Sequence, residues 1–438
     1  MDAKEQVASD VVRRLVAAGF ETYFAGGCVR DRLLGRTPAD YDVATAAPPE
    51  AVRKLFRRTV GVGAAFGVIL VMEGDFQFEV ATFRSDDAYV DGRHPTAVHF
   101  ASAERDAQRR DFTVNALFQD PATGQVIDFV GGQADLRAGV IRAIGDAHAR
   151  IKEDRLRMLR AVRFAARFGW EIEPGTRAAI RAAAASVTDM AAERIGDEIV
   201  KMLTEGSAKR SFVLLDETGL LPVVLPEIAA LHGVAQSSDF HPEGDVWTHT
   251  LLLLDQLPAG VPETLALGCL LHDVAKPLTA ARRDDGRITF YGHTDRGGEL
   301  ALAIVQRLKR SRDTWERVEY LVRSHLRLVQ APDMRLATLK RMLAEDGFDE
   351  LLTLSRLDAL ASSGDLQFVL YCERRRDELR ADVRPVRLLG GHDVMAMGVV
   401  AGPRIGALLR ALETAQLDGE VTTRDEAVAW VRRWIASE

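Results

Sequence analysis

The chain has 438 residues, of which 47% are hydrophobic and 28% charged, and its formal net charge is −7. This length predicts several globular domains, at roughly 150 residues per domain. The negative charge argues against a protein that coats nucleic acid nonspecifically, whereas locally concentrated basic residues would still permit RNA binding.

Cysteine usage and hydropathy favour a protein of the cytoplasm. Cys28, Cys269 and Cys372 are far apart and form no CxxC pair, so neither a disulfide framework nor a zinc knuckle is predicted. The first 20 residues mix charges into a helix-like pattern, which is unlike a secretory signal. The longest uncharged run, residues 60–72, is shorter than the ~20 residues that cross a bilayer. We therefore expect a cytoplasmic protein with no membrane contact.

Residues 20–145 mix helices with short strands, whereas the chain after residue 146 is rich in alanine, leucine and arginine at helical spacing. The break Glu73-Gly74-Asp75 between two apolar runs predicts a hairpin. The pattern is typical of the α+β class, with an almost entirely helical second part. Strands are expected at residues 21–25, 41–44, 67–72 and 76–83.

Gly26 and Gly27 lie between a predicted strand and a predicted helix, in the segment FAGGCVRD at residues 24–31. Backbone amides at a helix start can hold phosphate, and Arg30 in the first turn would add positive charge. A glycine pair in such a turn is structural more often than functional, so this motif alone is weak evidence.

Asp40 and Asp42 follow in the tripeptide DYD, which we expect inside a short strand. Because strand side chains alternate, both carboxylates would project from one face. Two carboxylates beside a phosphate cradle suit Mg²⁺, which prefers a few carboxylates together with substrate phosphates. Glu79 is a candidate third carboxylate, since it alternates with the core-facing residues of its strand. A plain exposed strand glutamate is an equally good interpretation of Glu79.

Four motifs occur in order: GGCVRD, DYD, RRDFTVNA at residues 109–116, and EDRLRMLRAVRF at residues 153–164, with ERI at 193–195. Together they resemble the class II tRNA nucleotidyltransferases, which include the CCA-adding enzymes and the bacterial poly(A) polymerases. The resemblance implies a nucleotidyltransferase-type mixed α/β head, followed by a helical neck, body and tail. It also implies Mg²⁺ at Asp40 and Asp42, and tRNA, CTP and ATP as partners. No protein partner is evident.

Asp154 and Arg157 are three residues apart in a predicted helix, so both can reach one base edge. The carboxylate would accept from the exocyclic amine of cytosine or adenine, and the guanidinium would donate to a ring acceptor. Uracil and guanine carry a carbonyl oxygen there, and each such mismatch should cost ~1–3 kcal/mol. An intrahelical ion pair on a solvated face is the alternative. The resemblance implies further nucleotide-site residues, with Asp111 and Asn115 organising the site: Arg110, Asp111, Asn115, Arg160 and Arg163. For Asn115, a buried turn residue is an equally good interpretation.

The family's mobile loop would correspond to residues 85–104, which are largely polar. A loop of this length inside a compact domain is more often functional than accidental. Near the C-terminus, residues 390–413 resemble a tail that accompanies such enzymes, where contact with the tRNA elbow and an ordinary proline helix start are both open.

A second group of imidazoles and carboxylates lies in the later half of the chain and resembles the HD superfamily of metal-dependent phosphohydrolases. Such ligands suit a divalent transition metal (Ni, Co, Mn or Fe), and this many ligands can hold a second ion. In related enzymes the module acts on phosphomonoesters or 2′,3′-cyclic phosphates. A helical module that has lost its metal is the alternative. The residues are His249, His272, Asp273, His293, His325 and Asp358.

We predict a template-independent enzyme that adds CCA to the 3′ end of tRNA, with a possible HD phosphohydrolase activity. Within the class, a poly(A) polymerase or an enzyme that adds only A or only CC stays open, although residues 62–70 lack a basic GRRF-like signature. Outside it, the rivals are a phosphohydrolase with an RNA-binding first half and a nonenzymatic RNA scaffold. The expected domains are a head (1–146), a neck (147–222), an HD domain (223–383) and a helical tail (384–438).

Overall fold

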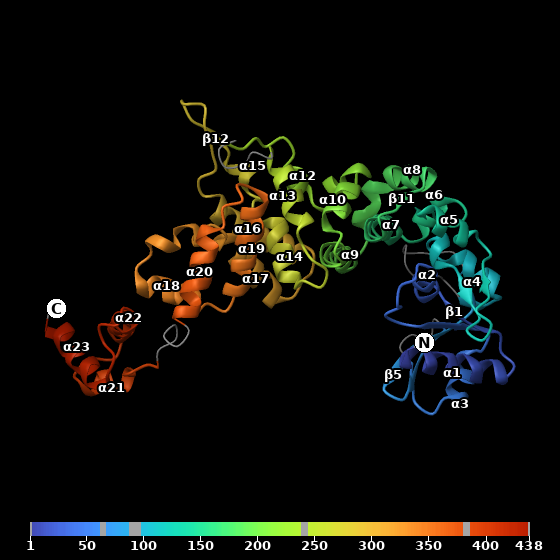
Figure 1. The fold of residues 1–438 in the computed structure, drawn as a ribbon, viewed down its shortest axis with the longest axis horizontal. Helices are drawn as coiled ribbons and strands as arrows, with labels where there is room; N and C mark the ends of the chain where they lie inside the picture. The colour runs from blue at the N-terminus through green and yellow to red at the C-terminus, as the bar shows by residue number, and fades with distance from the viewer. Residues whose placement is uncertain (1, 62–66, 87–97, 238–243, 380–385, 437–438) are drawn as a thin grey trace. The chain divides into compact units, whose positions relative to one another are not determined.

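The computed structural model describes residues 2–61, 67–86, 98–237, 244–379 and 386–436. They form two compact units (Figure 1). Unit 1 comprises residues 1–229 with 258–260, and unit 2 comprises residues 230–257 with 261–438.

A seven-stranded sheet is the centre of the head in unit 1, with the strand order β3-β4-β5-β2-β1-β8-β9. β4 and β5 pair antiparallel across residues 73–76, which confirms the predicted hairpin. β2 and β5 pair in parallel with Val43 opposite Val80, which places the start of β2 level with the middle of β5. The strands are β1 (Thr22–Ala25), β2 (Asp42–Thr45), β3 (Thr59–Val60), β4 (Val68–Glu73), β5 (Phe76–Thr82), β8 (Phe118–Gln119) and β9 (Val126–Ile127).

The two faces of this sheet differ because strand side chains alternate. Large apolar side chains such as Phe24, Val43 and Val80 pack in one core with helices α1 (Ala3–Ala17) and α3 (Pro49–Leu55). On the other face the strands carry small residues, among them Ala25, Ala44 and Ala81, all of which line a cleft. Small side chains on this face leave room for a ligand above the sheet.

Helices cover the cleft side of the head and continue into the neck. α7 is amphipathic and buries Met158, Leu159 and Val162, and it ends at Gly169, whose φ of 69° is a left-handed C-cap conformation that favours glycine. Besides α1 and α3, the helices of unit 1 are α2 (Gly27–Leu33), α4 (Ala103–Arg109), α5 (Gly132–Ala138), α6 (Ala147–Glu153), α7 (Leu156–Phe168), α8 (Pro174–Ala183), α9 (Ala192–Thr204), α10 (Ala208–Glu217), α11 (Leu221–Val224) and α12 (Pro226–Ala229). Short elements join them: 3₁₀ turns at Thr113–Asn115 and Ala184–Asp189, and strands β6 (Arg84–Asp86), β7 (Val98–Phe100), β10 (Val140–Ile141) and β11 (Glu171–Ile172).

Unit 2 is almost all helical, apart from the hairpin of β12 (Ala281–Arg282) and β13 (Ile288–Thr289). Its last three helices bury a separate core around Leu408, Leu412 and Val431. The helices are α13 (Val246–Asp255), α14 (Glu263–Leu271), α15 (Lys276–Thr279), α16 (His293–Arg307), α17 (Arg312–Ser324), a 3₁₀ helix (Arg327–Asp333), α18 (Leu336–Leu343), α19 (Phe348–Ala361), α20 (Gln367–Glu378), α21 (Gly391–Ala396), α22 (Pro403–Leu417) and α23 (Arg424–Ala436).

The predicted α+β class with a mixed head and a helical remainder is therefore confirmed. Within the described ranges, no helix combines the length and apolar character needed to cross a membrane.

Candidate active site and metal centre

Two carboxylates lie side by side at the floor of the cleft, on neighbouring strands. Asp42 is the first residue of β2, and Glu79 lies in β5. Their next neighbours, Val43 and Val80, are paired in parallel register. Asp42 and Glu79 therefore stand at the same level on strands about 4.8 Å apart, and both line the cleft.

Electrostatics within this pair favour a cation. Shielding from bulk water by the cleft, followed by the charge of Glu79, raises the pKa of Asp42 to about 6, although Arg110 opposes the shift. A carboxylate crowded by a second carboxylate gains when a divalent ion binds between them. The donor set, oxygen atoms at an open cleft, fits Mg²⁺.

Asp40 does not lie in the strand, and our expectation that DYD is a strand segment was wrong at this position. β2 begins only at Asp42, so Asp40 precedes it and does not line the cleft. Its side chain is 81% exposed, and Lys4 of α1 donates to Asp40 Oδ1 at 2.7 Å. The reason is local, since Tyr41 is buried in the α1 core and the chain turns over it before pairing begins.

The glycine turn brings backbone close to two arginines. Gly26 caps α2 with φ 71°, and a Cβ there would lie 3.0 Å from Arg110 Nη1, so the site requires glycine. Arg30 is buried, and its guanidinium donates to Asn115 Oδ1 at 2.6 Å and to Asp31 Oδ1. Burial, the largest influence, lowers the pKa of Arg30. Arg30 and Gly27 line the cleft.

Basic side chains surround the rest of the cleft, whose volume is about 600 Å³. Asp106 holds two of them, at 2.7 Å from Arg109 Nη2 and 3.0 Å from Arg110 Nη2. Asp111 holds Arg160 at 2.7 Å. Burial alone would raise the pKa of Asp111, but the Arg160 guanidinium keeps it below its ordinary value. The basic residues that line the cleft are Arg30, Arg84, Arg109, Arg110, Arg157, Arg160, Arg163 and Arg194.

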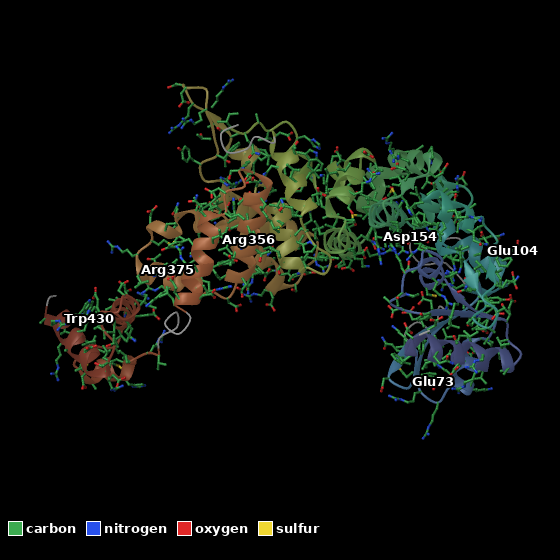
Figure 2. All side chains as sticks on the ribbon, in the orientation of Figure 1. Glu73, Glu104, Asp154, Arg356, Arg375 and Trp430 are labelled. Carbon is green, nitrogen blue, oxygen red and sulfur yellow. The ribbon has the colours of Figure 1, made fainter. Side chains whose placement is uncertain are left out.

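Asp154 and Arg157 both line the cleft but do not share one helix, contrary to our expectation. Asp154, labelled in Figure 2, is the C-cap of α6. α7 begins two residues later, and the Asp154 carboxylate accepts from Leu156 N at 3.0 Å. A break between helices at this point frees the carboxylate to face the cleft. Arg157 donates to Glu153 Oε2 and to Arg150 O, both at 2.8 Å.

The neck contributes two further interactions. Arg194 Nη2 lies 2.9 Å from Asp154 Oδ2 and lines the cleft. Arg163 is buried and donates to Glu198 Oε2 at 2.7 Å, joining α7 to α9. Sequence reasoning placed Arg163 at the nucleotide, and the structure places it at the cleft wall with this carboxylate partner.

Four basic residues of the cleft and the pocket were not predicted from the sequence: Arg84, Arg109, Arg194 and Lys276. Arg194 lies inside the noted ERI motif, and Lys276 is three residues after Asp273, so spacing was a usable signal for both. Residues 87–97 of the predicted mobile loop lie outside the described residues, as do residues 62–66 of the segment compared with poly(A) polymerases.

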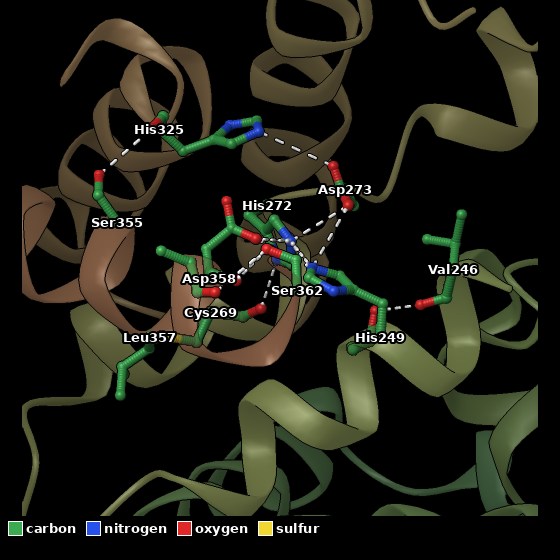
Figure 3. A network of polar contacts seen from close by, with 12 residues as sticks. Val246, His249, Cys269, His272, Asp273, His325, Ser355, Leu357, Asp358 and Ser362 are labelled. Atoms are coloured by element: carbon green, nitrogen blue, oxygen red, sulfur yellow. Dashed lines mark hydrogen bonds and ion pairs between the residues drawn. The ribbon is translucent and has the colours of Figure 1, made fainter. Parts of the chain in front are cut away.

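The second group converges in unit 2 as two adjacent sets that share Asp273. Figure 3 shows that carboxylate with His249, His272 and His325 around it. Asp273 is 2% exposed. Its Oδ2 lies 3.2 Å from His272 Nε2 and 3.9 Å from His249 Nε2. Its Oδ1 lies 3.7 Å from His293 Nε2 and 3.8 Å from His325 Nε2. A single carboxylate thus faces two pairs of imidazoles, which is the arrangement of a bridging ligand.

The histidine tautomers follow from backbone contacts. His272, His293 and His325 each place Nδ1 2.7–2.9 Å from the carbonyl oxygen three residues earlier. Each Nδ1 must therefore carry a proton and donate a hydrogen bond to that carbonyl. In the neutral ring, Nε2 is then unprotonated and has a free lone pair. His293 Nε2 and His325 Nε2 then face each other at 3.4 Å. Two opposed lone pairs repel unless a cation lies against them, so this donor set fits a metal ion.

Two further charged side chains and a pocket adjoin the histidine group. Asp358 Oδ1 lies 3.0 Å from His249 Nε2. Lys276 Nζ lies 2.6 Å from Asp273 Oδ2. Burial, the largest influence, lowers the pKa of His325 to about 4, so this imidazole is neutral at physiological pH. A pocket of about 360 Å³ opens onto the group, with Phe290 in its apolar wall.

Family models match three segments of the chain. Residues 22–142 match "Poly A polymerase head domain", residues 169–231 match "Probable RNA and SrmB- binding site of polymerase A", and residues 245–362 match "HD domain". These segments contain the sheet with the carboxylate floor of the cleft, the neck helices α8 to α12, and the histidine group, respectively.

Similar proteins agree with these matches. The chain is 40% identical to the CCA-adding enzyme of Latilactobacillus sakei over 258 residues, which are 58% of this chain and 65% of that protein. This alignment therefore spans slightly less than two thirds of that relative. The structure is similar to the CCA-adding enzyme of Bacillus stearothermophilus in complex with CTP, with a TM-score of 0.76, 27% identity, and coverage of 100% of this chain and 99% of that chain.

An alignment over nearly the whole length is found with the A-adding tRNA nucleotidyltransferase of Deinococcus radiodurans. Identity is 35% over 436 residues, which cover 93% of this chain and 94% of that protein. The order of head, neck and HD segments is thus shared along one continuous match. The chain belongs to the class II tRNA nucleotidyltransferases, the family of the CCA-adding enzymes.

Proposed function

We propose that this protein adds C and A, from CTP and ATP, to the 3′ end of tRNA, and that Asp42 and Glu79 hold the Mg²⁺ that the reaction needs. The observation that carries the proposal is the pair of carboxylates at one level of the sheet, beneath a cleft lined by a glycine turn and eight arginines. Acidic and basic groups gathered in this way match a metal-bound triphosphate.

The reaction is an in-line displacement. The 3′-hydroxyl oxygen of the RNA forms a bond to the α-phosphorus, the bond from that phosphorus to the bridging oxygen breaks, and pyrophosphate leaves while the hydroxyl proton passes to solvent. Mg²⁺, when bound, supplies electrostatic stabilisation of the phosphate oxygens. Arg30 and Arg110 lie beside the glycine turn and would neutralise the triphosphate. Asn115 and Asp111 orient Arg30 and Arg160.

Base selection is assigned to Asp154 and Arg157, with Arg160 and Arg163 along the same wall. The carboxylate of Asp154 is an acceptor held by Arg194 and by the start of α7. An acceptor at this point favours the amino groups of cytosine and adenine over the carbonyls of uracil and guanine. The same polarity serves both C and A, so one cleft is sufficient for CCA.

Addition of A alone is the second candidate, because the relative matched over 94% of its length is an A-adding enzyme. Incubation with three transcripts separates the outcomes: tRNA without CCA, tRNA without the final A, and an unrelated RNA. CCA addition extends the first by three nucleotides from CTP and ATP. An A-adding enzyme extends only the second, and a poly(A) polymerase extends all three.

We further propose that unit 2 is a metal-dependent phosphohydrolase. Support comes from the two ligand sets around Asp273, each with its carboxylate and two histidines, and from Asp358 beside the first set. Imidazole-rich ligands suit Ni, Co, Mn or Fe rather than Mg²⁺. Hydrolysis of a nucleoside 2′,3′-cyclic phosphate by the metal-loaded protein tests this, and retention of the activity in Asp42→Ala separates it from the first cleft.

The protein is assigned to the cytoplasm. The three cysteines are buried and free in the structure, which suits a reducing compartment. Its partners are tRNA, CTP and ATP, and we assign no membrane contact.

A further inference from the structure

Two phenylalanines of α7 carry arginines on their faces in a row that leaves the cleft. Phe164 lines the cleft and stacks on Phe168, with ring centroids 6.2 Å apart. Phe168 in turn lies 4.8 Å from the Trp170 ring. The guanidinium carbons of Arg30, Arg36 and Arg167 lie 4.6, 5.2 and 5.6 Å from the centre of the Phe168 ring. These six residues form what we call the Arg–Phe row.

Charge is compensated at the inner end of the row and much less at the outer end. Arg30 is buried and bonded to Asp31 and Asn115. Arg167 is exposed, and Glu205 is its ion-pair partner at a longer 3.6 Å. Arg36 is exposed, and no carboxylate in the described part of the chain forms an ion pair with it. The outer end therefore presents positive charge that can bind phosphate.

The composition of the row indicates its ligand. Aromatic rings interleaved with guanidinium groups are typical of surfaces that bind single-stranded nucleic acid, where bases stack and cations meet the backbone. Trp170 is only partly buried and packs over Gly139, where a Cβ would lie 3.1 Å from the indole. Glycine at that position leaves room for the indole, which lies beside Phe168.

The outer end of the row lies outside the cleft that we assign to the triphosphate, because neither Arg36 nor Arg167 lines it. α2 separates Gly27 from Arg36, and its seven residues span about 10 Å at 1.5 Å per residue. We propose that the Arg–Phe row binds the single-stranded 3′ end of the RNA, with Arg36 and Arg167 on backbone phosphates. The proposal rests on the function proposed above, since it gives the RNA strand its route to the cleft.

The test uses the full chain and two RNA hairpins, one with a four-nucleotide single-stranded 3′ tail and one blunt. We expect Arg36→Ala with Arg167→Ala to weaken binding of the tailed hairpin roughly tenfold, as for loss of charged hydrogen bonds. The slope of log affinity against log salt should fall by ~0.7 for each phosphate that the variant no longer neutralises. Binding of the blunt hairpin and of CTP should be unchanged. Trp170 fluorescence should respond to the tailed hairpin only, which Trp170→Phe identifies among the five tryptophans.

Arg312→Ala is the matched control, because Arg312 is an exposed arginine of unit 2 that pairs with Glu316. Unchanged affinity of the double variant for the tailed hairpin would overturn the proposal, and so would an equal loss with the blunt hairpin or a parallel loss of CTP binding. Failure of the proposed function is distinguishable, because the wild-type chain would then bind the tailed hairpin without extending it.

Discussion

Protons and Mg²⁺ should compete for Asp42, and this competition can be measured. The pKa of Asp42 is about 6, raised by shielding in the cleft and by Glu79. With that value, ~99% of the group is ionised at pH 8, half at pH 6 and roughly one tenth at pH 5. The apparent dissociation constant for Mg²⁺ should therefore rise about tenfold for each pH unit below 6, and stay nearly constant above pH 7.

Calorimetric titration of the full chain with Mg²⁺ between pH 5 and 8 is the assay, because Mg²⁺ binds imidazole poorly and reports the oxygen site. Two variants test the direction in which neighbouring charges shift the pH midpoint of Mg²⁺ binding. Glu79→Gln removes a charge that raises the pKa, so the pH midpoint should move down, and Arg110→Gln removes one that lowers it, so the midpoint should move up. Mg²⁺ affinity that is flat from pH 7 to 5.5, or midpoints that move the other way, would show that Asp42 does not bind the ion.

The free energy of unfolding of the metal-free protein should also depend on the protonation of Asp42, but in the opposite direction to Mg²⁺ affinity. A raised native pKa means that the protonated carboxyl is favoured in the fold. The stabilisation from Asp42 is fully present below its ordinary pKa of 3.8 and is lost as the pH rises through about 6.

Four further outcomes are expected. Asp42→Ala should abolish nucleotide addition and leave cyclic-phosphate hydrolysis intact, whereas Asp273→Asn should do the reverse; loss of both activities in either single variant would contradict two separate sites. Asp154→Ala should reduce discrimination of CTP against UTP by ~1–3 kcal/mol, about 5- to 150-fold in the ratio of kcat/KM, and an unchanged ratio would exclude a role in base reading. Glu198→Gln should lower the free energy of unfolding of unit 1 by roughly 3 kcal/mol, because it leaves the buried Arg163 with only the more distant Glu205; thermal and denaturant unfolding measure this, and a change below about 0.5 kcal/mol would show that the pair is dispensable. Loading the histidine centre with Mn²⁺ at 100 times its dissociation constant should stabilise unit 2 by about 2.7 kcal/mol over the chelated protein, and a melting temperature unaffected by chelator would contradict a folded metal site.

Much of the cleft could be predicted because it depends on local pattern. The β4–β5 hairpin follows from apolar runs on either side of Gly74, and the alternation along β5 places Glu79 opposite the core. Positions that depend on tertiary contacts could not be predicted. Asp40 lies outside the strand because Tyr41 is drawn into the α1 core, and Asp154 lies between two helices rather than within one.

The histidine centre likewise combines features that local pattern predicts with features that depend on tertiary contacts. Its ligand types were readable from the sequence, but the sharing of Asp273 by two sets depends on how α13, α14, α16 and α17 pack. The pairing of Arg194 with Asp154 likewise joins residues 40 positions apart. Such contacts arise from the arrangement of helices, which spacing along the chain does not encode.

Extension of a tRNA transcript that ends before CCA, by the purified full chain with Mg²⁺ and all four nucleoside triphosphates, tests the central claim most directly. We expect three added nucleotides, CCA, with no incorporation of U or G, and no addition by Asp42→Ala. A wild-type chain that leaves this transcript unextended, or an Asp42→Ala variant that extends it, would rule out CCA addition at the Asp42 cleft.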